Sequence, residues 1–148
     1  MINEIMSKKI IFGTLDSSIK DISKLMKHNN IGFIPIKDDN KYIGVITDRD
    51  ICIALPELKN INDSVKSYIT NNIVYVDSNS TIDEALNLMS KYRIKRLLVK
   101  DKDNTVGVLS LSDILNYTNS NIIKTCKSIF YIHDNSMMES AKIDDFYL

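Results

Sequence analysis

Two segments of the sequence each place a hydroxyl group three residues before an aspartate. GVITDRDI contains Thr47 and Asp50, and GVLSLSDI contains Ser110 and Asp113. This spacing is typical of a helix N-terminus, where the hydroxyl and the carboxylate accept hydrogen bonds from otherwise unpaired backbone N–H groups. The same arrangement could bind a ligand, because a carboxylate accepts hydrogen bonds from both hydroxyls of a ribose and the N–H groups of a helix start attract an anion. From the residues alone, both interpretations remain open.

The two segments belong to a repeat that covers most of the chain. An offset of 63 residues aligns positions 7–51 with positions 70–114 without a gap, and it pairs IPIKD with LLVKD. It also pairs Gly44 with Gly107. We expect these glycines to keep the strand slim near any ligand at the helix start that follows. A register kept over this length predicts two copies of one structural unit.

Each copy predicts the order strand, helix, strand, strand, helix. The runs IIFG and IVYV predict the first strand, and Ser18 with Asp21, or Thr81 with Glu84, have the spacing of a capping box at the start of the first helix. FIPI and RLLV predict the second strand. The polar turns KDDNK and KDKDN then lead to the third strand, YIGVI or TVGVL. The second helix begins at the hydroxyl residue of the segments described above.

A copy has only about 45 to 50 residues, too few to bury much of a core alone. We therefore predict an α+β fold in which two copies pack sheet to sheet, share a core and form a pseudo-twofold pair with a cleft on each side of the seam. We assign residues 1–55 to the first repeat, 56–69 to a linker, 70–118 to the second repeat and 119–148 to a C-terminal tail. The tail is either a frayed terminus, a strap over a dimer or a peptide that docks on a partner protein.

The composition indicates a folded protein and excludes several functions. Hydrophobic residues make up 44% and charged residues 26%, and the zero net charge argues against a nucleic-acid-binding protein. Cys52 and Cys126 lack metal-type or redox-type spacing, and Cys52 lies in an apolar run where we expect a buried thiol. His28 and His133 have no partners at metal-ligand spacing, so we expect no metal site, no cofactor and no enzyme. We find no signal peptide and no run of transmembrane length, and we expect a cytoplasmic protein that does not bind a membrane.

Over roughly residues 1–118, the sequence resembles a tandem pair of CBS (cystathionine β-synthase) domains. The resemblance rests on GVITDRDI and GVLSLSDI, on IPIKD and LLVKD, and on the opening Met6-Ser7; GVITDRDI is close to the form common in stand-alone bacterial CBS proteins. It implies two clefts for adenosine-containing ligands such as AMP, ADP, ATP, NAD, S-adenosylmethionine or certain cyclic dinucleotides. It also implies a homodimer that senses and regulates, with an unidentified protein partner to read the change. The alternative is a ligand-free dimerisation scaffold whose aspartates only cap helices.

The resemblance implies that each aspartate works with segments of the opposite repeat. One predicted cleft is formed by Thr47, Arg49, Asp50, Thr70, Val74, Lys95 and Arg96. The other predicted cleft is formed by Ser7, Ile11, Phe33, Ile34, Pro35, Ser110 and Asp113. Gly32 and Phe33 stand where the second repeat has Lys95 and Arg96. We therefore expect the first cleft to prefer phosphorylated adenosines and the second to bind more weakly or to take a less charged ligand, unless Arg96 reaches across the seam.

Overall fold

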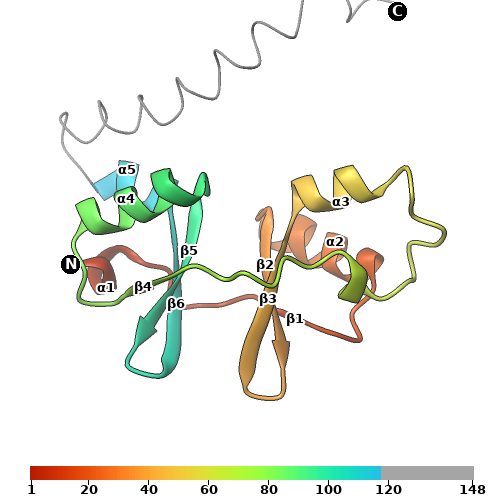
Figure 1. Cartoon of the computed structure of the whole chain (residues 1–148), viewed down its shortest axis with the longest axis horizontal. Helices are drawn as coiled ribbons and strands as arrows, with labels where there is room; N and C mark the ends of the chain where they lie inside the picture. The colour runs from red at the N-terminus through yellow and green to blue at the C-terminus, as the bar shows by residue number, and fades with distance from the viewer. Residues whose placement is uncertain (118–148) are drawn as a thin grey trace, which may run out of the picture.

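The structure is a computed structural model that describes residues 1–117, so the tail predicted at 119–148 lies outside the described residues. Figure 1 shows two halves side by side, each built on a three-stranded sheet. The first half contains β1 (Gly13–Thr14), α2 (Ile19–Asn29), β2 (Phe33–Asp38), β3 (Lys41–Thr47), α3 (Asp48–Ala54) and the 3-10 helix η1 (Val65–Ser67). The second half contains α1 (Ile2–Ile5), β4 (Tyr75–Asp77), α4 (Ile82–Tyr92), β5 (Arg96–Asp101), β6 (Asn104–Ser110) and α5 (Leu111–Tyr117).

The two sheets have the same topology, which confirms the predicted order of elements. In the first sheet β1 pairs with β2 in parallel, and β2 and β3 form an antiparallel hairpin. In the second sheet β4, β5 and β6 are paired in the same way. The hairpin register shifts between Ile36 and Lys37 and at the equivalent place of the second sheet. Both hairpins turn at the predicted polar segments, where Asp39 and Lys102 have left-handed backbone angles (φ of 47° and 55°).

The first long helix of each half begins at the predicted capping box. In α2, Ser18 Oγ accepts a hydrogen bond from the backbone N–H of Asp21 at 3.1 Å, and the backbone N–H of Ser18 donates to Asp21 Oδ2 at 3.1 Å. In α4, the corresponding bonds between Thr81 and Glu84 measure 3.2 and 2.8 Å. Because each cap satisfies two backbone N–H groups, the helix start is fixed by the local sequence.

The buried apolar side chains form two clusters, one in each half, and not the single shared core that we expected. Each cluster is completed by a segment that precedes the other repeat. Ile2 of α1 is fully buried in the second half, and Val65 of η1 is fully buried in the first half. The two halves are therefore joined by exchanged segments, and each sheet has its own core.

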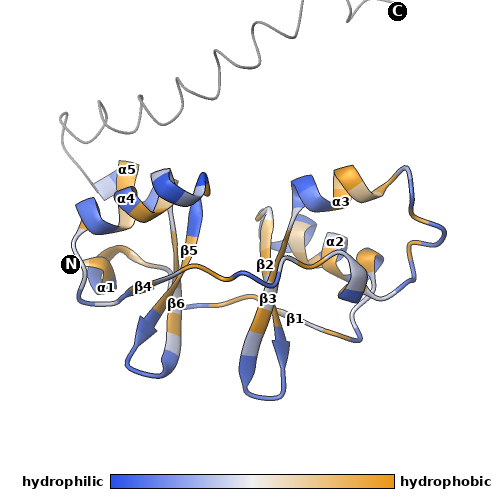
Figure 2. Ribbon diagram, in the orientation of Figure 1, coloured by the Kyte–Doolittle hydropathy of each residue, from blue (hydrophilic) through white to orange (hydrophobic). Residues whose placement is uncertain are grey.

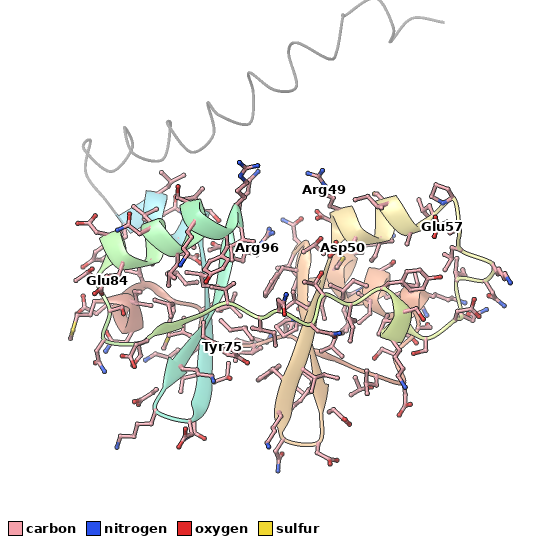
Figure 3. All side chains as sticks on the ribbon, viewed as in Figure 1. Arg49, Asp50, Glu57, Tyr75, Glu84 and Arg96 are labelled. Carbon is pink, nitrogen blue, oxygen red and sulfur yellow. The ribbon has the colours of Figure 1, made fainter. Side chains whose placement is uncertain are left out.

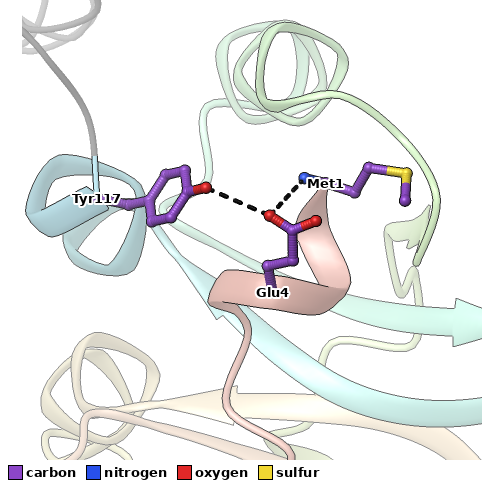
Figure 4. A network of polar contacts seen from close by, with 3 residues as sticks. All are labelled: Met1, Glu4 and Tyr117. Atoms are coloured by element: carbon purple, nitrogen blue, oxygen red, sulfur yellow. Dashed lines mark hydrogen bonds and ion pairs between the residues drawn. The ribbon is translucent and has the colours of Figure 1, made fainter.

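Polar contacts also tie α1 to the second half (Figure 4). The hydroxyl of Tyr117 in α5 donates a hydrogen bond to Glu4 Oε2 at 3.2 Å, and the amino group of Met1 forms an ion pair with the same oxygen at 3.2 Å. These side chains are exposed, so the contacts contribute little to stability. The burial of Ile2 is therefore the stronger reason why α1 packs on the second half.

Two chain segments cross the seam, one from α1 to β1 and one from η1 to β4 (Figure 1). Backbone hydrogen bonds fix both crossings. Ser7 and Val108 exchange N–H to carbonyl bonds of 2.9 Å in each direction, and Val45 and Thr70 exchange bonds of 2.9 and 2.8 Å. Each crossing segment is thereby attached to the edge of a hairpin from the opposite repeat.

The paired glycines make these crossings possible. A Cβ atom at Gly107 would lie 2.7 Å from the carbonyl oxygen of Ser7, and a Cβ atom at Gly44 would lie 3.0 Å from the carbonyl oxygen of Thr70. Both distances are shorter than ordinary van der Waals contact. We expected these glycines to leave room for a ligand, but in the structure they leave room for the backbone of the crossing segments.

Helix α3 contains apolar residues, coloured orange in Figure 2, and some of them are exposed. Ile51 and Ala54 face the core, and the helical period then directs Cys52 and Ile53 outward. Cys52 is exposed, so the expectation of a buried thiol is wrong. Ile53 is 63% exposed, and Leu55, directly after the helix, is 55% exposed. In the part of the chain that the structure describes, no helix is long and apolar enough to cross a lipid bilayer.

Candidate functional site

The predicted caps form at the starts of both α3 and α5. Asp113 Oδ2 accepts hydrogen bonds from the backbone N–H of Ser110 at 2.8 Å and from its hydroxyl at 2.6 Å. Asp50 Oδ2 accepts the equivalent bonds from Thr47 at 2.8 and 2.7 Å. The capping interpretation is therefore confirmed at both positions. Since the cap engages Oδ2, the second oxygen, Oδ1, is the one that a ligand could use.

A cavity of about 410 Å³ opens beside the start of α5. Ligand pockets in proteins typically have volumes of about 300–1,000 Å³, so this cavity is large enough for a nucleoside. Its lining comes from both repeats and from a crossing segment. The lining residues are Ser7, Lys9, Ile11, Asn29, Asn30, Ile31, Phe33, Pro35, Arg96, Val108, Ser110, Ser112 and Asp113.

Most residues predicted for the second cleft line this cavity: Ser7, Ile11, Phe33, Pro35, Ser110 and Asp113. Ile34 does not line it, because its side chain is fully buried in the core of the first half. Neighbouring residues of a strand point to opposite faces, so Ile34 faces the core while Phe33 faces the seam. The structure thus brings together residues that lie more than one hundred positions apart in the sequence, such as Ser7 and Asp113.

Two cations border the cavity. Arg96, at the start of β5, was predicted for the Asp50 cleft but lines the cavity that contains Asp113. We gave this position of Arg96 as the alternative, but no crossing of the seam is needed, because Arg96 lies opposite Ser110 in the β5–β6 hairpin of the second half. Lys9 was missed by the sequence analysis, although it lies on the crossing segment between two predicted residues. Its equivalent in the second repeat is Asn72, so the repeat gave no signal of a charged residue at this position.

Other lining residues were also missed, because they come from the end of α2 and the turn that follows it. Asn29 ends α2, and Asn30 has the left-handed conformation that terminates the helix. Ser112 is on α5, and its hydroxyl lies 2.8 Å from the hydroxyl of Ser110. The polar C-terminal end of α2 and the polar start of α5 thus meet at the cavity. Because these helices belong to different repeats, the sequence of one repeat alone does not predict this contact.

The other residues predicted for the Asp50 cleft line neither of the two cavities described in residues 1–117, so this cleft stays a prediction. Figure 3 shows Arg49 and Asp50 at the start of α3, on the other side of the seam from Arg96. Three further members of this set lie on the second crossing segment and in the turn before β5: Thr70, Val74 and Lys95. Arg96 pairs with Ser110 across the β5–β6 hairpin and lines the cavity at Asp113, whereas Asp50 caps α3 in the first half.

The sequence and the structure were compared with those of known proteins. The model of the CBS domain family matches residues 2–57 and 65–120. The CBS domain-containing protein YhcV of Bacillus subtilis is 26% identical over 114 residues, which cover 76% of this chain and 81% of YhcV. The two matched stretches contain the two copies of the sequence repeat, positions 7–51 and 70–114.

Two solved structures illustrate the similarity. The crystal structure of Hypoxic Response Protein I with two coordinated zinc ions has a TM-score of 0.71 and 28% identity, over 80% of this chain and 98% of that one. Residues 1–117 of the present chain contain no group of His, Cys, Asp and Glu side chains that could hold a metal ion. The CBS domain pair of protein MJ0100, in complex with 5'-methylthioadenosine and S-adenosyl-L-methionine, has a TM-score of 0.70 and 29% identity, over 78% and 93% of the two chains. With both repeats matched in sequence and in structure, the chain belongs to the CBS domain family and forms a tandem pair of CBS domains.

Proposed function

We propose that this CBS pair is a regulatory module that binds an adenosine-containing ligand of the AMP, ADP, ATP, NAD or S-adenosylmethionine class at the seam between its repeats. The observation that supports the proposal is the cavity at α5, where a capped carboxylate, apolar side chains and a guanidinium converge from both repeats. The proposal includes a cytoplasmic location and no catalytic step.

Each part of an adenosyl ligand has a matching group in the cavity. Asp113 Oδ1 would accept hydrogen bonds from the ribose hydroxyls, and a hydrogen bond to a charged group contributes about 1.5–3 kcal/mol. Ile11 and Phe33 offer apolar surface to the adenine. Arg96 and Lys9 would neutralise phosphate groups or a carboxylate. Because these cations border the cavity, the reason for expecting a less charged ligand on this side no longer holds, and we propose that it accepts a phosphorylated adenosine.

A related protein supports the ligand class. The CBS pair of MJ0100 has been solved with 5'-methylthioadenosine and S-adenosyl-L-methionine, and both of these molecules contain an adenosyl group. In the present chain the ribose of such a group would meet Asp113, and the substituent on its 5' carbon would extend toward Arg96. The 5' substituent would then decide which ligand binds most tightly.

Ligand binding would favour one arrangement of the two halves, because the cavity is lined by residues of both repeats. We further propose that the module is a homodimer. Ile53 and Leu55 give α3 an exposed apolar surface through which two copies could associate. A change in the angle between the halves would move this surface, and an unidentified protein partner would read the change.

A thermal-shift screen against AMP, ADP, ATP, NAD, S-adenosylmethionine and cyclic di-AMP tests the proposal. A ligand present at about 100 times its dissociation constant adds about 2.7 kcal/mol to the free energy of unfolding, so a true ligand raises the melting temperature. Calorimetric titration of Asp113→Ala and Asp50→Ala with the best ligand then locates the site. We expect Asp113→Ala to weaken ligand binding, and we expect Asp50→Ala to leave binding at the Asp113 cavity unchanged. Binding that is unchanged in both variants would refute the site assignment.

A second candidate function is a ligand-free dimerisation scaffold. It is favoured by one observation, namely that both aspartates complete helix caps and thus have a structural role without any ligand. A panel of flat thermal shifts, together with a dimer in light scattering, would support the scaffold and reject the sensor.

A further inference from the structure

A second cavity, of about 550 Å³, lies between the turns of the two β-hairpins. We call it the hairpin groove; it is lined by Lys37, Asn40, Lys41, Tyr42, Tyr75, Lys100, Asp103, Asn104 and Thr105. Both hairpins extend from the sheets on the side away from α3 and α4 (Figure 1). None of the residues discussed for the adenosyl ligand lines the groove, so it is separate from the cavity at Asp113.

The groove lies on the pseudo-twofold axis of the pair. The repeat offset of 63 residues relates Lys37 to Lys100, and it likewise relates the other groove residues of the first hairpin to those of the second. Equivalent positions therefore face each other across the seam. Figure 3 places Tyr75 at the seam, closer to the hairpins than Arg96. A ligand in the groove would contact both repeats at once.

Two of the three groove lysines, Lys37 and Lys100, contact aromatic rings and not carboxylates. Lys37 Nζ lies 5.2 Å from the centre of the Phe12 ring and 5.9 Å from that of Tyr42, and Lys100 Nζ lies 4.0 Å from the centre of Tyr75. These distances are within the range of about 6 Å for cation–π contacts. A ring orients an ammonium group without neutralising it. Within residues 1–117, none of the groove lysines forms an ion pair, so their charge is available to an anion.

The tyrosines add neutral hydrogen-bond donors. Burial raises the pKa of Tyr42, and the nearby phenol of Tyr75 raises it further. The hydroxyl of Tyr42 therefore stays protonated and can donate to an anion. The amides of Asn40 and Asn104 and the hydroxyl of Thr105 supply further donors at the same place.

We propose that the hairpin groove binds a compact anion with two or more linked phosphate groups. Three lysines against one aspartate, Asp103, give the lining a positive charge, and lysine ammonium groups bind phosphate well as point charges. Outside the groove, the same hairpins carry three exposed aspartates, Asp38, Asp39 and Asp101, against one further exposed cation, Lys102, so their remaining charge is negative. A long acidic peptide or a nucleic acid would meet these carboxylates where it leaves the groove, whereas a small anion would not.

The test is a titration of the ¹⁵N-labelled full chain with sodium tripolyphosphate at constant ionic strength, followed by NMR. We expect the amide signals of Asn40, Lys41, Asn104 and Thr105 to shift in a saturable way, while the signal of Asp113 stays in place. Lys37→Gln combined with Lys100→Gln should weaken binding about tenfold or more, because it removes both charges that the rings orient. The spectrum of each variant also reports directly that the protein is folded.

A matched variant distinguishes a site from general attraction. Lys59→Gln combined with Lys66→Gln removes the same charge from exposed positions outside the groove and should leave the affinity unchanged. Equal losses in the two double variants would show non-specific attraction and would overturn the proposal. An absence of saturable shifts at the hairpins in the unmodified chain would overturn it as well.

Three additional titrations identify the source of the phosphates and keep this proposal separate from the adenosyl site. Adenosine alone should shift signals only near Asp113. If ATP shifts the hairpin signals and tripolyphosphate competes with ATP, the groove binds the phosphate chain of a nucleotide. If only tripolyphosphate shifts the hairpin signals, the groove binds free polyphosphate. A hexaglutamate peptide that binds as tightly as tripolyphosphate would reject the phosphate assignment. Since the Asp113 signal is followed in every titration, either site can fail without the other.

Discussion

Replacing Gly107 by alanine should destabilise the pair by displacing a crossing segment. The new Cβ would lie 2.7 Å from the carbonyl oxygen of Ser7 and 2.7 Å from the sulfur of Met6. The Met6 side chain can move aside, but the Ser7 oxygen belongs to the backbone and is held by a hydrogen bond from the N–H of Val108. Relief of the clash therefore requires the crossing segment to move away from β6.

The size of the effect follows from the bonds that hold the segment. Ser7 and Val108 exchange two backbone hydrogen bonds, each of 2.9 Å. A hydrogen bond of this kind contributes about 0.5–1.5 kcal/mol net, so the loss of both costs about 1–3 kcal/mol. Alanine also lowers the conformational entropy of the unfolded chain, which stabilises the folded protein by about 0.4–1 kcal/mol. We expect the free energy of unfolding to fall by about 1–2 kcal/mol, and adenosyl-ligand affinity to fall too because Ser7 lines the cavity.

Urea unfolding of the variant, followed by circular dichroism, measures this change. Gly32→Ala is the matched control, because the three atoms closest to a Cβ at Gly32 all belong to the exposed side chain of Asp48, which can rotate away. Gly44→Ala should fall between the two, since its Cβ would lie 3.0 Å from the Thr70 oxygen. If Gly107→Ala and Gly32→Ala are equally stable, the crossing segment does not depend on close backbone approach and the reasoning fails.

Three other variants test further features of the structure. Asp113→Asn should keep most of the helix cap, because the amide oxygen can still accept the hydrogen bonds from residue 110. Adenosyl-ligand affinity should fall about tenfold, because the second oxygen is replaced by an amide group that donates hydrogen bonds. Equal affinity of the variant and the unmodified chain in calorimetry would contradict the role assigned to Asp113. Hydrogen bonds from the backbone and the hydroxyl of Thr81 hold the pKa of Glu84 below its ordinary value of 4.5. The resulting stabilisation is complete above that value and is lost as the pH falls through the lowered pKa, so Glu84→Gln should reduce the loss of stability in acid, measured by urea unfolding at stepped pH. Ile53→Glu with Leu55→Glu should convert the proposed dimer to a monomer in light scattering, and a persistent dimer would place the interface elsewhere.

The elements that could be predicted from the sequence are those fixed by near neighbours. Ser18 with Asp21 and Thr47 with Asp50 form their caps within one helical turn, and spacing alone therefore identifies them. The hairpin turns likewise depend on a few consecutive polar residues. The repeat then doubled each of these signals, because the same local pattern occurred twice.

The family resemblance implied contacts between opposite repeats, but the core that each exchanged segment completes could not be predicted, because packing between residues far apart in the chain decides it. Ile2 and Val65 are ordinary apolar residues in sequence, and nothing near them shows which sheet they will cover. Gly107 gave a partial indication, because a glycine within a strand often marks the close approach of another group. The sequence did not show that this group is the backbone of residue 7. Lys9 lies between Ser7 and Ile11, which the family resemblance had assigned to this cleft, but its counterpart Asn72 gave no indication of a charged residue there.

Capping and ligand binding are compatible functions of the same aspartate. Two hydrogen bonds to Oδ2 hold the Asp113 side chain in one orientation before any ligand arrives. A side chain that is already ordered loses little conformational entropy on binding, so the cap would increase the affinity of Oδ1 for a ribose hydroxyl. The same cap is present at Asp50, so the caps cannot distinguish the two helix starts. Any difference in ligand preference must then come from residues that the repeat did not conserve between its copies, above all Arg96, which has Phe33 as its counterpart.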